Sequence, residues 1–113
     1  MHEYAVIKDT LEIVLEEAAK ANAKEVLEIR LAIGELSLFE ESSIRMYFDI
    51  LGKDTIAQEA KISIRTIDAQ MHCGECEIDF SAAANDYLCP QCGRAGKLLH
   101  TGNDFYIESI EIE

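Results

Sequence analysis

The feature that most restricts the fold of this chain is a pair of matching cysteine turns. The stretch "CGEC" holds Cys73 and Cys76, and "CPQCG" holds Cys89 and Cys92 after twelve intervening residues. Two such turns at this separation are typical of tetrahedral four-thiolate metal sites. We therefore predict a zinc ribbon over residues 70–103. Four thiolates leave the metal no open coordination position, so we expect the zinc to be structural and not catalytic.

Two other readings of the cysteines remain, an iron site of the rubredoxin type and a redox dithiol. The dithiol reading fits less well, because such motifs are normally single and are placed on a helix. The segment has few apolar residues, so we expect metal binding to supply its folding free energy, roughly 10–16 kcal/mol for small zinc modules. We also expect Gly74 and Gly93 to provide the backbone freedom that the two turns need.

Outside the cysteine segment, apolar residues repeat with helical or extended periodicity. Residues 4–21 predict an amphipathic helix that ends near Asn22, and a second helix begins between Glu41 and Ser43 and ends at Gly52. Strands are expected at residues 25–33, 60–68 and 104–113. The residues expected to face the core of these elements are Ile7, Leu11, Val14 and Ala18; Leu27, Ile29, Leu31 and Ile33; Ile44, Tyr47, Phe48 and Leu51; and Ile62 and Ile64.

These elements predict an α+β fold with two helices packed on a small sheet of about three strands. The last strand cannot bury itself, so we expect it to join the sheet that the first two strands form. The four-cysteine zinc ribbon is then an inserted subdomain. We predict one domain of residues 1–69 plus 104–113 and a second domain of residues 70–103. The apolar alternation shifts between Ile107 and Ile110, which allows a β-bulge or a change of face.

Charge and composition exclude several classes of protein. The chain has 10 Lys and Arg against 22 Asp and Glu, a formal net charge of −12, which repels nucleic acid and anionic membranes. No stretch approaches the roughly 20 apolar residues needed to span a bilayer, and the first residues lack the basic region of a signal peptide. We therefore expect a cytoplasmic protein with reduced thiols. No catalytic constellation is recognisable, so we do not expect an enzyme.

The first three residues, Met-His-Glu, carry a possible second metal site. The Met1 amine, the His2 amide nitrogen and the His2 Nδ1 can close adjacent chelate rings around one ion. Nitrogens arranged in a plane favour Ni(II) or Cu(II), and Glu3 can add a fourth donor. The alternative is a solvated His2 near a helix start, where the Glu3 carboxylate faces the helix dipole. The residues alone leave both readings open.

Taken together, "MHE", "LAIGELS", "CGEC", "CPQCG" and the closing "ESIEIE" resemble the nickel-incorporation proteins of the HypA family over essentially the whole chain. The resemblance implies a metallochaperone that receives Ni(II) at Met1, His2 and Glu3. It also implies a HypB-type GTPase partner and transfer of nickel to the large subunit of a [NiFe] hydrogenase. In some organisms the family also serves urease, which would bring urease accessory proteins as partners. The family's zinc site is structural and distinct from the nickel site.

Several assignments stay open at this stage. His72 and His100 are candidate additional nickel donors, and the alternative for each is a surface histidine on a loop. Glu35 is a candidate for orienting the N-terminus or meeting a partner, against a plain turn carboxylate. The sequence does not decide between monomer and homodimer, or between hydrogenase and urease as the recipient. The alternative function is a zinc-ribbon adaptor that binds other proteins and delivers no metal.

Overall fold

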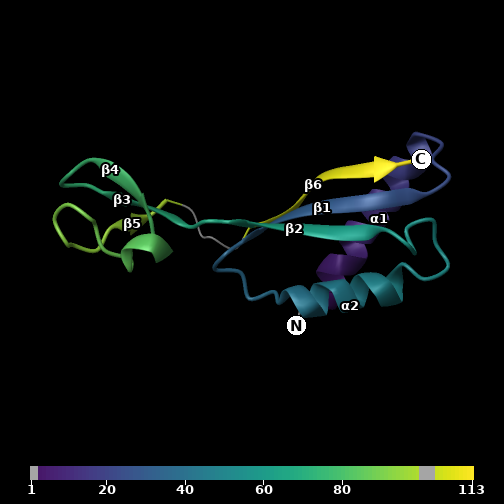
Figure 1. The fold of residues 1–113 in the computed structure, drawn as a ribbon, viewed down its shortest axis with the longest axis horizontal. Coiled ribbons are helices and arrows are strands. Elements are labelled where there is room, and N and C mark those ends of the chain that lie inside the picture. Colours follow the sequence, from purple (N-terminus) through teal and green to yellow (C-terminus); the bar gives the residue numbers. More distant parts are fainter. Residues whose placement is uncertain (1–2, 100–103) are drawn as a thin grey trace. The chain divides into compact units, whose positions relative to one another are not determined.

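The computed structural model describes residues 3–99 and 104–113, and the chain divides into two compact units. The larger unit comprises Met1–Ala32, Phe39–Arg65 and Tyr106–Glu113, and the smaller comprises Ile33–Leu38 and Thr66–Phe105. The predicted fold class is confirmed. Two helices accompany a three-stranded mixed sheet, and a second small sheet carries the four-cysteine cluster (Figure 1). The assignment of a nickel-binding domain (residues 1–69 plus 104–113) and a zinc-binding domain (70–103) stays a prediction.

Helix α1 (Glu3–Lys20) buries the stripe predicted from its periodicity. Ile7, Leu11, Val14 and Ala18 are all buried. Thr10 is buried as well, and its hydroxyl is satisfied by donating to the Val6 carbonyl oxygen at 2.7 Å. Asn22 adopts a left-handed backbone conformation, with φ of 56°, just after the helix ends. Asparagine tolerates this conformation better than most residues, which explains why the helix stops where the sequence predicts.

Helix α2 (Glu41–Leu51) packs against α1. Ile44 and Phe48 are buried, whereas Tyr47, also expected in the core, is only half-buried. The Tyr47 ring instead meets Tyr4 of α1 edge to face, with centroids 5.7 Å apart. Such a pair contributes roughly 0.5–1.5 kcal/mol beyond the area that it buries, and it ties the first turn of α1 to α2.

Among the described residues, no helix has the length and apolar character required to cross a bilayer.

Gly52 ends α2 because of close packing and not because of a left-handed backbone. Its N–H donates to the Phe48 carbonyl oxygen at 2.8 Å, and its φ is −80°. A Cβ atom at this position would lie 2.8 Å from that same oxygen. Any larger residue would therefore press the end of the helix apart, so glycine is needed here for space.

The larger sheet has the strand order β2-β1-β6, with β1 (Val26–Gly34) in the centre, β2 (Lys61–Ile67) on one side and β6 (Phe105–Ile112) on the other. Bonds from Val26 N–H to the Ile56 oxygen and from Glu35 N–H to the Ile67 oxygen advance in the same direction, so β1 and β2 are parallel.

Strand β6 runs antiparallel to β1. The N–H of Lys24 donates to the Glu113 oxygen near one end of β1, and the N–H of Gly34 donates to the Asp104 oxygen near the other. The last strand therefore joins the sheet formed by the first two, as the sequence predicts. Helix α2 provides the long crossover that the parallel pair β1 and β2 requires.

Burial along the strands follows the predicted faces only in part. Leu27 and Ile64, expected in the core, are half-buried, whereas Val26 is fully buried. Ile29 and Leu31 are fully buried, but Ala32, expected on the outer face, is also fully buried. A central strand is flanked on both edges, so a small residue is covered there whichever way it points. In β6 the exposed pair Glu108 and Ser109 interrupts the alternation. This pattern is the one expected of a bulge that keeps the isoleucines on both sides of it facing the same way.

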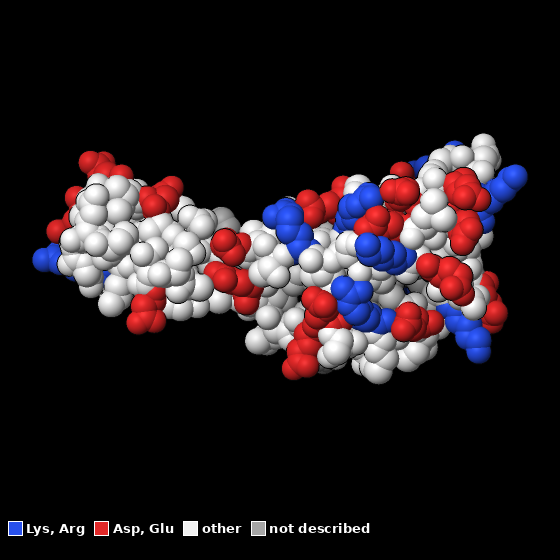
Figure 2. Space-filling model, in the orientation of Figure 1, with Lys and Arg blue, Asp and Glu red and all other residues white. Residues whose placement is uncertain are grey.

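The face of the sheet opposite the core carries interleaved charges, and Figure 2 shows acidic and basic groups intermixed over this unit. Arg30 of β1 bonds Glu28 at 2.7 Å and Glu111 at 3.0 Å, and Arg65 of β2 bonds Glu108 of β6 at 2.9 Å. These pairs are solvated, so each adds little to stability. Their main effect is to link the three strands through complementary charges.

The smaller unit contains regular structure that hydrophobic periodicity does not predict. Strands β3 (Gln70–Cys73), β4 (Ile78–Ser81) and β5 (Lys97–Leu98) form an antiparallel sheet in the order β4-β3-β5. A single 3₁₀ turn, η1 (Ala83–Asn85), follows β4. Six buried residues of this unit form one hydrophobic cluster, which consists of Ala69, Met71, Cys73, Phe80, Ala82 and Cys89.

The central position of β1 generates a stability prediction. Ile29 is fully buried, so Ile29→Ala should lower the free energy of unfolding of the larger unit by about 2–5 kcal/mol through lost burial and a cavity. Ile50 on α2 is 58% exposed, so Ile50→Ala should change it by no more than about 0.5 kcal/mol. Urea unfolding followed by far-UV circular dichroism measures both, and equal losses would contradict the assignment of Ile29 to the core.

Candidate metal centre

The four cysteines converge on one point of the smaller unit. Their sulfur atoms all lie within 4.8 Å of one another, and the Sγ atoms of Cys73 and Cys92 are 3.6 Å apart. Metal–sulfur bonds of about 2.3 Å in a tetrahedron put the sulfurs about 3.8 Å apart. The cluster is therefore already close to the size at which four thiolates enclose one metal ion, with no position left for a substrate or water.

The first cysteine turn follows strand β3 directly. The Glu77 N–H donates to the Cys73 carbonyl oxygen at 2.8 Å, and the Cys76 N–H points at the Cys73 sulfur at 3.5 Å. The residue with a positive φ is Glu77, at 53°, and not Gly74. The expectation that Gly74 supplies the special backbone conformation is therefore wrong, because the chain makes its left-handed step after the second cysteine and not between the two.

The second turn matches the sequence expectation. Gly93 adopts a φ of 76°, and its N–H donates to the Cys89 carbonyl oxygen at 2.9 Å. The Gln91 N–H points at the Cys89 sulfur at 3.4 Å. Backbone N–H groups aimed at sulfur stabilise negative charge on it, so both turns are built to hold thiolates.

Ionisation of the four thiols is unequal. Backbone N–H donation from Cys92, with further help from Gln91, lowers the pKa of Cys89 to about 7. Burial, followed by the neighbouring cysteine sulfurs, raises the pKa of Cys76 to about 12. Four sulfurs held this close cannot all carry negative charge by themselves. A metal ion that enters the cluster must therefore displace protons, and it removes the repulsion that otherwise opposes the arrangement.

The cluster is part of the core of its unit. Cys73 and Cys89 are 3% and 2% exposed and pack with Met71 and Phe80. Gly96 fits against this core so closely that a Cβ atom would lie 2.8 Å from the Phe80 ring. Two of the four candidate ligands are thus also core residues, so metal binding and side-chain packing stabilise the same small structure.

His72 lies next to Cys73 but does not belong to the cluster. Neighbouring residues of a strand point to opposite faces, and the His72 Nδ1 lies 2.7 Å from the Asp79 Oδ1 on the adjacent strand β4. Such a pairing fixes the ring and leaves Nε2 as its remaining donor atom. The sequence interpretation did not include Asp79. A cross-strand partner of this kind follows only from the register of β3 and β4, which periodicity does not give.

The remaining predicted site residues lie elsewhere. Glu35 accepts a bond from the Ala69 N–H at 2.7 Å, so its carboxylate fastens the smaller unit internally. Glu3 is the first residue of α1, and its Oε2 is buried without a hydrogen-bond partner among the described residues. Met1, His2 and His100 lie outside the described residues, so their proposed roles as nickel donors remain predictions.

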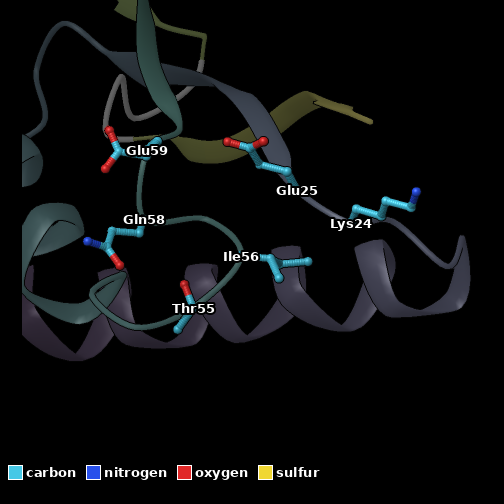
Figure 3. Close-up of a pocket in the computed structure, with 6 residues that line it drawn as sticks. All are labelled: Lys24, Glu25, Thr55, Ile56, Gln58 and Glu59. Carbon is cyan, nitrogen blue, oxygen red and sulfur yellow. The ribbon is translucent and has the colours of Figure 1, made fainter.

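A polar pocket of about 290 Å³ lies beside the loop that joins α2 to β2. Its lining residues include Lys24, Glu25, Gln58 and Glu59, and Figure 3 shows their side chains spread around the loop without converging. The Gln58 side chain accepts a bond from the Asp54 N–H at 2.9 Å and so serves the loop itself. This pocket does not gather donors as the cysteine cluster does.

The shared role of Cys73 generates a second prediction. Cys73→Ser should release the bound metal and unfold the smaller unit, because it removes both a ligand and a core side chain. The larger unit, whose core is separate, should stay folded. Metal content by elemental analysis and amide NMR signals of Phe80 and Ile44 test the two parts. Loss of the Ile44 signals together with those of Phe80 would contradict the independence of the two cores.

Comparison with known proteins agrees with this architecture. Residues 1–112 match the family described as "Hydrogenase/urease nickel incorporation, metallochaperone, hypA". The chain is 39% identical over 114 residues to the hydrogenase maturation factor HypA of Caldanaerobacter subterraneus subsp. tengcongensis, with all of both chains covered. It is 33% identical to the hydrogenase maturation factor HybF of Escherichia coli O157:H7, again across the full length of both chains.

Two solved structures share the fold. A solution structure of a HypA protein superposes with a TM-score of 0.73 at 25% identity, covering 100% of this chain and 97% of that one. The solution structure of the nickel metallochaperone HypA from Helicobacter pylori gives a TM-score of 0.67 at 23% identity, covering 99% and 97%. The resemblance seen in the sequence is thereby confirmed. The chain belongs to the HypA family of hydrogenase/urease nickel-incorporation metallochaperones, and its function is metal delivery and not catalysis.

Proposed function

We propose that this chain binds Ni(II) through the Met1 amine, the His2 amide nitrogen and Nδ1, and Glu3. It then delivers the ion to the large subunit of a [NiFe] hydrogenase in the cytoplasm. The observation that carries the proposal is the family match, which begins at residue 1 and so includes the Met-His-Glu start. The chain is predominantly acidic, with a net charge of −12, which favours the approach of cations.

The chemistry of these donors suits a metal that must later be released. Nitrogens in one plane, including a deprotonated amide, favour Ni(II) over Zn(II). Binding displaces protons from the amine and the amide, so protonation offers a route to release. A site made of terminal main-chain atoms therefore combines selectivity for nickel with exchange, which transfer to another protein requires.

The environment of Glu3 supports its inclusion in the site. Its Oε2 is buried and has no hydrogen-bond partner among the described residues. A buried carboxylate oxygen normally needs a donor or a cation nearby, because its desolvation is otherwise costly. The edge-to-face contact of Tyr4 with Tyr47 holds the same helical turn in place. A metal or ammonium group at the first residues would satisfy this oxygen.

The four-cysteine cluster holds zinc in this proposal. Zinc suits four thiolates in a closed tetrahedral site and has no redox chemistry that would damage them. The candidate ligands Cys73, Cys76, Cys89 and Cys92 supply the full set. The zinc keeps the smaller unit folded, and the transported nickel does not occupy this site.

A HypB-type GTPase and, where urease is the recipient, urease accessory proteins are the partners in this proposal. The sequence resemblance implies these partners, and the match to a family of hydrogenase/urease nickel incorporation supports them. His72 and His100 remain candidate additional donors. His72 presents its free Nε2 from a ring that Asp79 orients, an arrangement common among metal-binding histidines.

The N-terminal site is tested by calorimetry of Ni(II) binding to protein with its native first residue. His2→Ala should abolish stoichiometric nickel binding, because it removes the only side-chain nitrogen of the proposed plane. The same result is expected when one residue is added before Met1, because the amine then moves away. Zinc content and the far-UV circular dichroism spectrum should stay unchanged in both proteins.

His72→Ala and His100→Ala are the companion variants, because each removes one candidate additional donor and leaves the Met-His-Glu start intact. We expect both to keep one nickel per chain. Tight 1:1 nickel binding by the extended protein would disprove the terminal site. Unchanged hydrogenase maturation by His2→Ala would instead favour the adaptor function, in which the ribbon only binds other proteins.

The role of Glu3 is tested separately with Glu3→Gln, which keeps the shape of the side chain and removes its charge. If the carboxylate binds the metal, nickel affinity measured by calorimetry should fall about tenfold or more. Glu41→Gln, which removes the acidic residue from the first turn of α2, is the matched control and should leave affinity unchanged. Equal affinity of the Glu3→Gln protein and the wild type would remove Glu3 from the donor set.

A further inference from the structure

We propose that the free edge of strand β6 and the groove beside it bind an extended segment of another protein, one in which apolar residues alternate with basic residues. The added segment would lengthen the sheet by one strand and place its apolar side chains in the groove. This surface belongs to the larger unit, and its occupation does not depend on either metal site.

The first support is the edge itself. Strand β6 lies at the edge of its sheet, and its neighbour in the strand order is β1. The opposite edge of the sheet, β2, is protected by the exposed charges of Lys61 and Arg65. Strand β6 has eight residues and contains no lysine, arginine or proline. Over residues 107–112, which border the groove, this edge therefore lacks the basic side chains that protect β2.

The second support is an apolar groove of about 370 Å³ directly beside this edge. Ile13 and Val14 of α1 form one wall, and Ile107, Ile110 and Ile112 of β6 form the other. Ile13 is 53% exposed. The groove lies within reach of alternate side chains of a strand added to β6, because those side chains would point to the same face as the three isoleucines.

The third support is charge, which decides what kind of segment fits. Helix α1 and strand β6 together carry seven acidic residues against two lysines. Arg65 and Arg30 of the neighbouring strands bond two of the seven, Glu108 and Glu111, so an acidic excess remains. Glu17 lines the groove, and Lys20 is paired with Glu16 and Glu17. A basic segment is therefore favoured, both in its approach and in its final position.

The same charges disfavour a second copy of this chain as the occupant. Two β6 strands paired with each other would bring Glu108 and Glu111 of both copies together, and β6 itself contains no basic residue. Like charges on neighbouring strands destabilise pairing. The basic groups that balance Glu108 and Glu111 come from Arg65 and Arg30 of the same chain and are not available to a partner copy.

The test uses a short capped peptide of alternating lysine and valine as the probe, titrated into ¹⁵N-labelled full-length protein. We expect saturable chemical-shift changes confined to β6 and to the part of α1 around Ile13. A peptide with the same sequence but with alternate backbone amides methylated cannot form the strand pairing on its bonding edge. It should bind at least about tenfold more weakly.

Two groove variants and one matched control locate the binding surface. Ile13→Lys places charge in the groove, and Glu17→Lys reverses its rim charge without touching a buried residue. Each should weaken peptide binding at least about tenfold. Ile50→Lys makes the same change as Ile13→Lys at a residue of similar exposure on α2, outside the groove, and should leave binding within about twofold.

Three outcomes would overturn the proposal. Equal binding of the methylated peptide would mean that charge attraction alone, without strand pairing, holds the probe. Equal weakening by Ile50→Lys would mean that the site is elsewhere. Dimerisation of the protein by itself in analytical ultracentrifugation, with shift changes at Ile110 and Ile112, would assign the groove to a second copy.

Discussion

Mutual repulsion among four sulfur atoms is the constraint on which the smaller unit depends. The cluster brings the Cys73 and Cys92 sulfurs to 3.6 Å, a distance at which several thiolates cannot coexist without a cation. Burial raises the pKa of Cys76 to about 12, and backbone N–H donation lowers that of Cys89 to about 7, so the four thiols do not lose their protons with equal ease. A bound ion removes this conflict, and the packing around Met71 and Phe80 is stable in the same geometry.

Because metal binding by the cysteines and folding of the smaller unit depend on each other, the two metals of the proposal need different kinds of site, one that retains its ion and one that releases it. A structural ion must not exchange, so its ligands are four thiolates from two rigid turns, two of them buried. A transported ion must exchange, so donors at the first residues of the chain suit it better. Placing both functions in one site would make nickel release and unfolding of the smaller unit the same event. Separate donor sets let the protein release one ion and retain the other.

The predictable parts of the fold are those that a local sequence pattern determines without help from long-range contacts. The stripe of α1 and the ligand spacing of the cysteines are of this kind. The burial of Ala32 was not predictable, because it depends on β1 becoming the central strand, which long-range pairing decides. The left-handed backbone conformation of Glu77 was not predicted either, because it depends on where the chain turns and not on where glycine occurs. Strands β3 and β4 have four residues each, which is too short for a periodic signal, so the His72–Asp79 pair between them was not predictable.

The positions of the charged residues show which parts of this acidic chain can attract a partner. On the outer face of the sheet, Arg30 and Arg65 are bonded to glutamates of their own chain, so the basic residues there are largely committed. Helix α1 beside the β6 edge, with five acidic residues against two lysines, carries part of the excess negative charge. Long-range attraction from such a surface raises the rate at which cations and basic segments arrive, but it does not select among them. Selection must come from short-range geometry: planar nitrogens for one ion, clustered thiolates for another, and an apolar groove with an open strand edge for a protein segment.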